Sequence, residues 1–174
     1  MNYVKNIVLI GFMGTGKTAV GKRLAGRLNR EFVDTDAAIE KLTGKSISEI
    51  FRKDGVIRFR SEEKLQVQKL ASKTGLVIST GGGLVLDKEN VELLQKNGVL
   101  ICLTADPEVI YNRVRNKRKR PLLQKGDVKE TVYRLMQERK ESYKVAEFTV
   151  DTGKGSLNET VDKIVAYLKE QKYI

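Results

Sequence analysis

The sequence predicts an α/β fold in which helices flank a five-stranded parallel sheet, and two observations indicate this class. Short apolar runs alternate along the 174-residue chain with longer amphipathic stretches, which is the order of a parallel sheet with crossover helices. The runs are apolar at consecutive positions, as strands buried on both faces are. A chain of this length is expected to form one domain over residues 1–174.

Five apolar runs are expected to form the strands. In chain order they are residues 6–10, 31–34, 76–80, 99–103 and 148–151. Because ligands of open α/β sheets bind at the carboxyl ends of the strands, the residues that follow these runs are candidates for a functional site.

Capping signals predict where several helices begin and end. In a capping box a short polar side chain caps the helix and an acid three residues later completes the motif. A further helix is expected to begin with Pro107 after Asp106, and the preceding one to end at Asn97 and Gly98. The three capping boxes are Ser46 with Glu49, Asp127 with Glu130, and Ser156 with Glu159.

The composition excludes several kinds of chemistry. The chain has no histidine, so a histidine base, nucleophile or metal ligand is excluded. The single cysteine, Cys102, lies in an apolar run and is expected to be buried, and no intrachain disulfide is possible. No run approaches the roughly 18 apolar residues of a membrane span, and the amino terminus has no cleavage-type site, so we expect a cytoplasmic protein.

The charge favours anionic partners without choosing among them. Lysine and arginine number 33 against 22 acidic residues, which gives a formal net charge of +11. Nucleotides, small carboxylates, nucleic acids and anionic membrane surfaces all suit such a surplus.

A glycine-rich segment after the first expected strand predicts a phosphate-binding loop. Gly11, Gly16, Lys17 and Thr18 fit the pattern G-x-x-x-x-G-K-[S/T], between a strand and an amphipathic helix. Glycines let consecutive backbone N–H groups face an anion, and the helix points its positive end to the same place. Lys17 would reach the β and γ phosphates and the Thr18 hydroxyl would bind Mg²⁺. A loose glycine-rich turn is the alternative, and the strand–helix context favours a nucleoside triphosphate site.

Two acids after the second expected strand are candidates for the metal side of this site. The run 76–80 ends in Ser79 and Thr80 without an acid, so the carboxylate must come from elsewhere. Asp34 and Asp36, two residues apart in an extended chain, would project from one side into the cleft. The alternative is that Asp36 caps a helix starting at Ala37.

Six motifs occur in order along nearly the whole chain and together resemble the shikimate kinases. They are GFMGTGKT from residue 11, DTD at 34–36, FRSEE at 59–63, TGGG at 80–83, RPLL at 120–123 and RLMQERKESY at 134–143. The resemblance implies a three-layer P-loop kinase fold like that of nucleoside monophosphate kinases, with a mobile lid. It also implies transfer of the γ-phosphoryl of ATP to the 3-hydroxyl of shikimate with Mg²⁺, by a protein that we expect to be monomeric and to bind neither nucleic acid nor a membrane.

The same resemblance assigns the nucleotide side of the site. It gives Lys17 a catalytic role and places Mg²⁺ on Thr18 and on Asp34, the latter through water. Arg120 would swing over the phosphates with a lid at 115–126, and Arg113 would lie near the adenine. The other loop residues implied in nucleotide binding are Gly14, Thr15, Gly16 and Ala19.

The acceptor side is implied in the same way, within a substrate-binding segment at 35–62 and beyond it. Asp36 would bind shikimate hydroxyls and accept the proton of the attacking one. Arg60 and Arg139 would grip the carboxylate, which suits the planar fork of a guanidinium. The backbone that approaches the substrate would be that of Gly81, Gly82 and Gly83.

Each of these assignments has a simpler alternative. Arg60 and Glu63 would also make a surface ion pair on a helix, Arg139 would suit an ordinary polar helix face, and the glycine run a loose loop. Six of the eight residues at 113–120 are basic, which fits a nucleic-acid patch or a solvated face as well as a lid. Kinases of another polyhydroxy acid, such as gluconate, and a nucleotide-dependent nucleic-acid-binding protein are the competing functions.

Two departures from the family pattern concern local detail. Val56 and Ile57 stand where the family commonly has an acid after the glycine, so packing around Arg60 is expected to differ. The loop at 152–157 lacks the proline or arginine expected beside the adenine.

Overall fold

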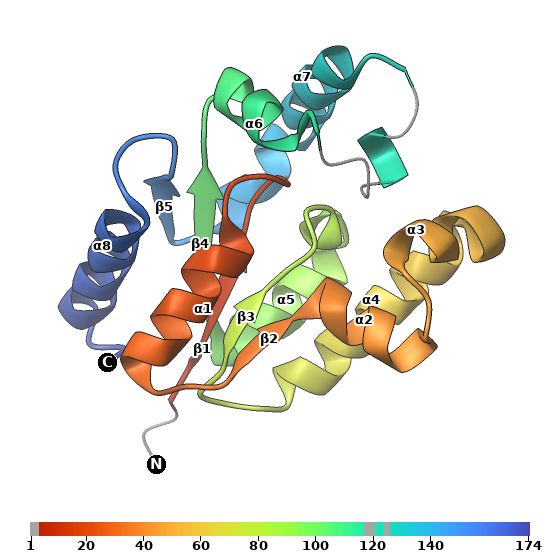
Figure 1. Cartoon of the computed structure of the whole chain (residues 1–174). Helices are drawn as coiled ribbons and strands as arrows, with labels where there is room; N and C mark the ends of the chain where they lie inside the picture. The colour runs from red at the N-terminus through yellow and green to blue at the C-terminus, as the bar shows by residue number, and fades with distance from the viewer. Residues whose placement is uncertain (1–3, 117–120, 124–125) are drawn as a thin grey trace.

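The computed structural model describes residues 4–116, 121–123 and 126–174, and within them one sheet of five parallel strands in the order β2-β3-β1-β4-β5 (Figure 1). The predicted fold class is therefore confirmed. The strands are β1 (Asn6–Ile10), β2 (Phe32–Asp34), β3 (Val77–Ser79), β4 (Gly98–Thr104) and β5 (Phe148–Asp151). Three strands differ from the expected bounds by one residue: β2 begins one residue later, β3 is shorter at both ends, and β4 is longer at both ends.

Strand β1 lies at the centre of the sheet, between β3 and β4. Val8 is in register with Ile78 on one side and with Leu100 on the other. Because all pairs are parallel, the carboxyl ends of the strands share one edge of the sheet, and the glycine-rich loop leaves from its middle.

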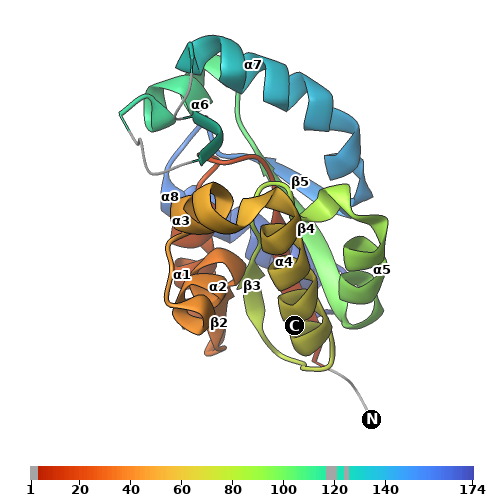
Figure 2. The same ribbon diagram turned by 90° about the vertical axis from the view of Figure 1, so that its right-hand side faces the viewer.

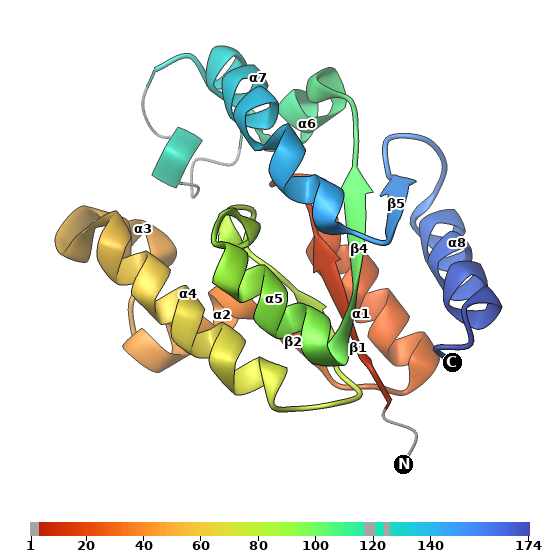
Figure 3. The same cartoon turned by 180° about the vertical axis from the view of Figure 1, so that it is seen from behind.

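Helices cover both faces of the sheet, which gives three layers (Figures 1 and 3). Helices α1 and α8 lie on one face and α4 and α5 on the other. Helices α6 and α7 lie across the carboxyl edge (Figure 2). The α-helices are α1 (Lys17–Leu28), α2 (Thr35–Thr43), α3 (Ile47–Glu49), α4 (Gly55–Ala71), α5 (Lys88–Asn97), α6 (Pro107–Val114), α7 (Val128–Arg139) and α8 (Leu157–Glu170). Shorter helical turns are η1 (Ile50–Asp54), η2 (Leu84–Leu86), η3 (Pro121–Leu123) and η4 (Lys140–Val145).

Alternate side chains of β1 supply the two halves of the core. Ile7 and Leu9 pack toward α1 and α8, whereas Val8 and Ile10 pack toward α4 and α5. Cys102 is buried in the second half, as expected, and burial raises the pKa of its thiol to about 11. None of the helices in the described ranges is long and apolar enough to cross a membrane.

The three capping boxes are confirmed at their caps. Ser46, Asp127 and Ser156 each accept a hydrogen bond from the amide three residues later, at 3.1, 3.2 and 3.2 Å. Pro107 begins α6 and Asn97 ends α5, as predicted. The helix that Ser46 caps has only three residues, because the chain continues at once into the π-helical turn η1.

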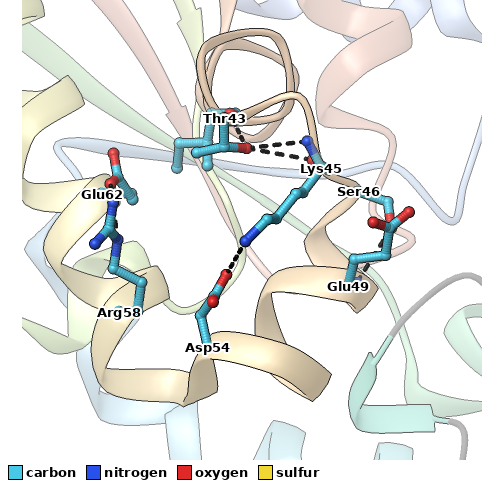
Figure 4. A network of polar contacts seen from close by, with 8 residues as sticks. Thr43, Lys45, Ser46, Glu49, Asp54, Arg58 and Glu62 are labelled. Carbon is cyan, nitrogen blue, oxygen red and sulfur yellow. Dashed lines mark hydrogen bonds and ion pairs between the residues drawn. The ribbon is translucent and has the colours of Figure 1, made fainter.

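A polar network holds the segment between α2 and α4 together (Figure 4). Lys45, in the loop after α2, makes an ion pair with Asp54 at the end of η1, with Nζ and Oδ2 2.8 Å apart. Thr43 accepts a hydrogen bond from the Lys45 amide at 3.3 Å. These contacts tie the end of α2 to the start of α4, which carries Arg60.

Candidate active site

A cleft of about 560 Å³ opens at the carboxyl edge of the sheet, beside the glycine-rich loop. This is the size of an ordinary small-ligand site. Its lining brings together predicted residues from four parts of the sequence: Gly14, Thr15, Gly16, Lys17, Thr18 and Ala19 from the loop and α1, Asp34 and Asp36 where β2 passes into α2, Gly81 and Gly82 after β3, and Arg113 from α6.

The glycine-rich loop has the form expected of a phosphate site. Gly16 has φ 96° immediately before α1 begins at Lys17, a conformation that a side chain would strain. A β-carbon at Gly14 would lie 2.7 Å from Val114 Cγ1, so the loop also packs closely on α6. The first amides of α1 and the positive end of its dipole face the cleft, which is the arrangement that binds anions.

The Lys17 side chain is held by hydrogen bonds to the backbone of this loop. Its Nζ donates hydrogen bonds to the carbonyl oxygens of Gly11 at 2.7 Å and Phe12 at 2.9 Å, and the side chain is buried. The ammonium group is therefore held at the mouth of the loop, where phosphate oxygens would meet it.

Asp34 contacts both the loop and the next helix. Its Oδ2 accepts a hydrogen bond from Thr18 Oγ1 at 3.0 Å, and its Oδ1 accepts one from the Ala37 amide at 3.0 Å. The alternative that Asp36 caps a helix starting at Ala37 is wrong: α2 begins at Thr35, Asp34 is its cap, and Asp36 lies in its first turn. The two acids reach the cleft because the chain turns into a helix here, and not because it stays extended.

The oxygens of Thr18 and Asp34 suit magnesium. Mg²⁺ prefers hard oxygen ligands and is held by one or two protein groups together with substrate phosphates and water. The described part of the chain holds no cluster of three or more acidic, cysteine or histidine ligands, and a site of this kind needs none.

Asp36 is the most perturbed acid of the cleft. Burial, together with the nearby carboxylates of Asp34 and Glu63, raises its pKa to about 6, although the charge of Lys17 opposes the shift. Its Oδ1 is buried without a hydrogen-bond partner among the described residues. A carboxylate in this state is an acceptor for a proton or a hydroxyl group at neutral pH.

The glycine run after β3 packs against charged side chains, so it is not a loose loop. A β-carbon at Gly81 would lie 2.7 Å from Asp36 Oδ1 and 3.1 Å from Glu63 Oε2. At Gly83 it would lie 3.0 Å from Arg60 Nη1. Only glycine leaves room here for the charged groups to approach the backbone.

Arg60 and Glu63 form a partly buried pair rather than a surface pair. Arg60 Nη1 lies 2.6 Å from Glu63 Oε1, and the Glu63 side chain is 1% exposed. Burial raises the pKa of Glu63, although Arg60 and Arg139 both lower it. Glu63 was expected only as a surface partner of Arg60, and no signal in the sequence marks it as buried.

Arg139 is buried at the end of α7, which rules out an ordinary polar helix face. It is 7% exposed, and its guanidinium lies over the Phe12 ring, 5.9 Å from the centroid. Its Nη1 is 3.6 Å from where a β-carbon of Gly82 would be. Within the described ranges no acid forms an ion pair with Arg139, although it acts on Glu63 through its charge. A buried cation in this position is suited to an anionic ligand.

Arg113 ties the loop to the far end of the cleft. Its Nη1 donates to the Gly14 carbonyl at 3.0 Å and its Nη2 to the Thr152 carbonyl at 2.8 Å. The Thr152 hydroxyl in turn donates to the Thr15 carbonyl at 2.7 Å. Thr152 was not predicted as a site residue from the sequence. The expectation for the loop at 152–157 concerned only a proline or arginine beside the adenine, and the loop has neither.

The predicted lid at 115–126 lies in a segment that the structure describes only in part. Arg120 lies outside the described residues, as do all of 117–120 and 124–125. Of the remaining segment, Leu123 is buried against Ile110 and Val132.

The fold and the site together define a P-loop kinase. The defining features are the parallel sheet, the glycine loop that ends in Lys17 and Thr18, and the acids at the end of the next strand. The chain matches the model of the shikimate kinase family over residues 13–169, and it belongs to that family. It is 66% identical to the shikimate kinase of Pelotomaculum thermopropionicum over 98% of this chain and 99% of that protein. It is 57% identical to the shikimate kinase of Desulforudis audaxviator over 98% of this chain and 90% of that protein.

Solved structures agree with this assignment. Shikimate kinase from Acinetobacter baumannii, in complex with shikimate, is similar with a TM-score of 0.93 and 37% identity, over 97% of this chain and 94% of that one. A gluconokinase from Sinorhizobium meliloti has a TM-score of 0.57 at 16% identity. That likeness concerns the fold alone.

Proposed function

We propose that this protein transfers the γ-phosphoryl of ATP to the 3-hydroxyl of shikimate, giving shikimate 3-phosphate and ADP. The observation that carries the proposal is the convergence of Arg60 and Arg139 on the glycine run beside the P-loop. Two cations beside the glycine run suit a carboxylate, and Asp36, with its raised pKa, suits a hydroxyl. A compact acid with several hydroxyls matches both.

The nucleotide is held by the loop and the start of α1. Backbone amides from Gly14 to Ala19 surround the β and γ phosphates, and Lys17 exchanges its loop carbonyls for phosphate oxygens. Thr18 and Asp34 would hold Mg²⁺, which would neutralise part of the phosphate charge. Arg113 and the loop at 152–157 form the end of the cleft that receives the adenine.

The acceptor is held by its carboxylate and its hydroxyls. Arg60, braced by Glu63, and Arg139 make charge-assisted hydrogen bonds to the carboxylate. The open backbone of Gly81, Gly82 and Gly83 lets the ring of the substrate lie close to the sheet. Fixing the acceptor beside the phosphate is the main contribution of a kinase to phosphoryl transfer.

Asp36 binds the attacking hydroxyl and takes its proton. Its Oδ1 is free of hydrogen bonds within the described residues and its pKa of about 6 leaves it ionised at neutral pH. As the hydroxyl oxygen bonds to phosphorus, its proton passes to this carboxylate and the bond to ADP breaks. Lys17 favours the ionised form of Asp36 until the transfer occurs.

Three further assignments belong to the proposal. The segment 35–62 acts as the substrate-binding unit, supported by the polar network around Lys45 and Asp54. Residues 115–126 act as the lid that brings Arg120 to the phosphates, which rests on the family resemblance. The third assignment is that the enzyme works as a monomer, which rests on the family resemblance alone.

Replacing the carboxylate of the acceptor tests the proposal. The purified protein is given Mg·ATP with shikimate or with methyl shikimate, and kcat/KM is measured for each. We expect the ester to lose at least about tenfold, and Arg139→Gln to reduce this preference. Equal use of acid and ester would contradict recognition of the carboxylate by Arg60 and Arg139, and no use of either would contradict the proposed function.

A further inference from the structure

Tyr143 makes a contact with the glycine run that the proposed mechanism does not use. It lies in η4, directly after α7, and its hydroxyl donates a hydrogen bond to the Gly82 carbonyl oxygen at 2.6 Å. Its ring packs against the half of the core that lies between the sheet and helices α4 and α5. It also packs against the apolar cluster formed with residues of α6 and α7. The side chain thus joins the sheet layer to the layer that carries Arg139.

The Gly82 carbonyl depends on this hydroxyl. The carbonyls on either side, of Gly81 and Gly83, accept hydrogen bonds from the amides of Leu84 and Leu86, each at 3.1 Å. Among the described residues the Gly82 carbonyl has Tyr143 as its partner. The middle residue of the run is therefore positioned by a side chain and its neighbours by backbone turns.

Arg139 is next to the same hydroxyl. It lies four residues before Tyr143, and its Nη1 is 3.6 Å from where a β-carbon of Gly82 would be. Burial raises the pKa of the Tyr143 hydroxyl to about 12, although the neighbouring Arg139 lowers it. The hydroxyl therefore remains a protonated donor throughout the physiological pH range.

We infer that Tyr143 is a positioning residue for the carboxylate subsite, in which its hydroxyl holds the Gly82 backbone at a fixed place relative to Arg139. The inference rests on the proposed function, because the subsite is the one proposed to hold the shikimate carboxylate. The ring supplies packing and the hydroxyl supplies alignment, so the two contributions are separable. Misalignment weakens the binding of shikimate in its ground state and leaves the nucleotide side unchanged.

Tyr143→Phe removes the hydroxyl and keeps the ring. We expect the KM for shikimate to rise about three- to tenfold, which corresponds to one hydrogen bond. The KM for ATP and kcat should change less than about twofold. The matched control is Tyr133→Phe, which removes a tyrosine hydroxyl from α7 that donates to Glu108 at 2.8 Å. This control should change none of the three constants.

A double-mutant cycle separates alignment of Arg139 from a general effect on the fold. If Tyr143 acts through Arg139, adding Tyr143→Phe to Arg139→Ala should raise the KM for shikimate by less than it does alone. The inference would be overturned if the two substitutions had fully additive effects on the KM for shikimate, if this KM were unchanged in Tyr143→Phe, or if the KM values for ATP and shikimate rose equally. In each of these cases, turnover of shikimate by the wild type would still uphold the proposed function. Absence of that turnover in the wild type would overturn both.

Discussion

Glu63 Oε1 lies 2.6 Å from Arg60 Nη1, and the Glu63 side chain is 1% exposed whereas the Arg60 side chain is 34% exposed. The acid is therefore buried and braces an arginine that is partly exposed beside Gly83. Its second oxygen, Oε2, has no hydrogen-bond partner among the described residues and is close to Gly81. The pair orients Arg60 before a ligand arrives.

Glu63→Gln should weaken this orientation. The amide lacks the charge that holds Arg60, so we expect the KM for shikimate to rise about fivefold or more, with the KM for ATP unchanged. Steady-state kinetics with each substrate varied checks this. The matched control is Glu62→Gln on the same helix, since Glu62 pairs with Arg58 at 2.9 Å on the other side of α4. Equal effects of the two variants would show that the pair does not serve the cleft.

Asp34→Asn should separate the two contacts of Asp34. Asparagine caps helices well, so the cap on the Ala37 amide and the unfolding free energy should be kept within about 0.5 kcal/mol. The lost charge should raise the Mg²⁺ concentration for half-maximal activity about tenfold. A magnesium titration of the rate, beside a urea unfolding curve, measures both. An unchanged magnesium dependence would remove Asp34 from the metal site.

The raised pKa of Asp36 predicts how activity depends on pH. With a pKa of about 6, the carboxylate gains a proton as the pH falls through 6 and can no longer accept one from shikimate. We expect kcat/KM for shikimate to fall about tenfold per pH unit below this value, because this constant reports the free enzyme. A pH profile that stays level down to pH 5 would contradict the assignment.

The same shift predicts an effect on stability. A carboxyl whose pKa rises from 3.8 unfolded to about 6 folded costs stability as the pH rises through this interval, and the full cost applies above 6. Asp36→Asn should therefore be more stable than the wild type at pH 8 by on the order of 3 kcal/mol, and equally stable below about pH 3. Urea unfolding at both pH values checks this. As a control, Asp162→Asn changes an exposed acid on α8 and should show no such gain.

The sequence was sufficient where local rules decide the structure. Apolar runs predicted the five strands, and the loop with Gly16, Lys17 and Thr18 was recognisable from its spacing alone. The caps at Ser46, Asp127 and Ser156 were predicted because a helix start depends on a few neighbouring residues.

The remaining features depend on contacts between distant parts of the chain. Asp34 and Asp36 look alike in the sequence, and which one caps α2 is decided by where β2 ends against β3. The burial of Glu63 and the position of Tyr143 depend on the glycine run after β3, some distance away in the sequence. Single-sequence patterns carry no information on such pairs.

ADP release by the purified protein with Mg·ATP tests the central claim most directly, measured with shikimate, with gluconate and without an acceptor, in the wild type and in Asp36→Asn. We predict that shikimate alone stimulates release by the wild type with formation of shikimate 3-phosphate, and that Asp36→Asn binds ATP as before and loses this stimulation. If ATP binds and shikimate does not stimulate release by the wild type, the phosphate loop stands and the acceptor is a different molecule.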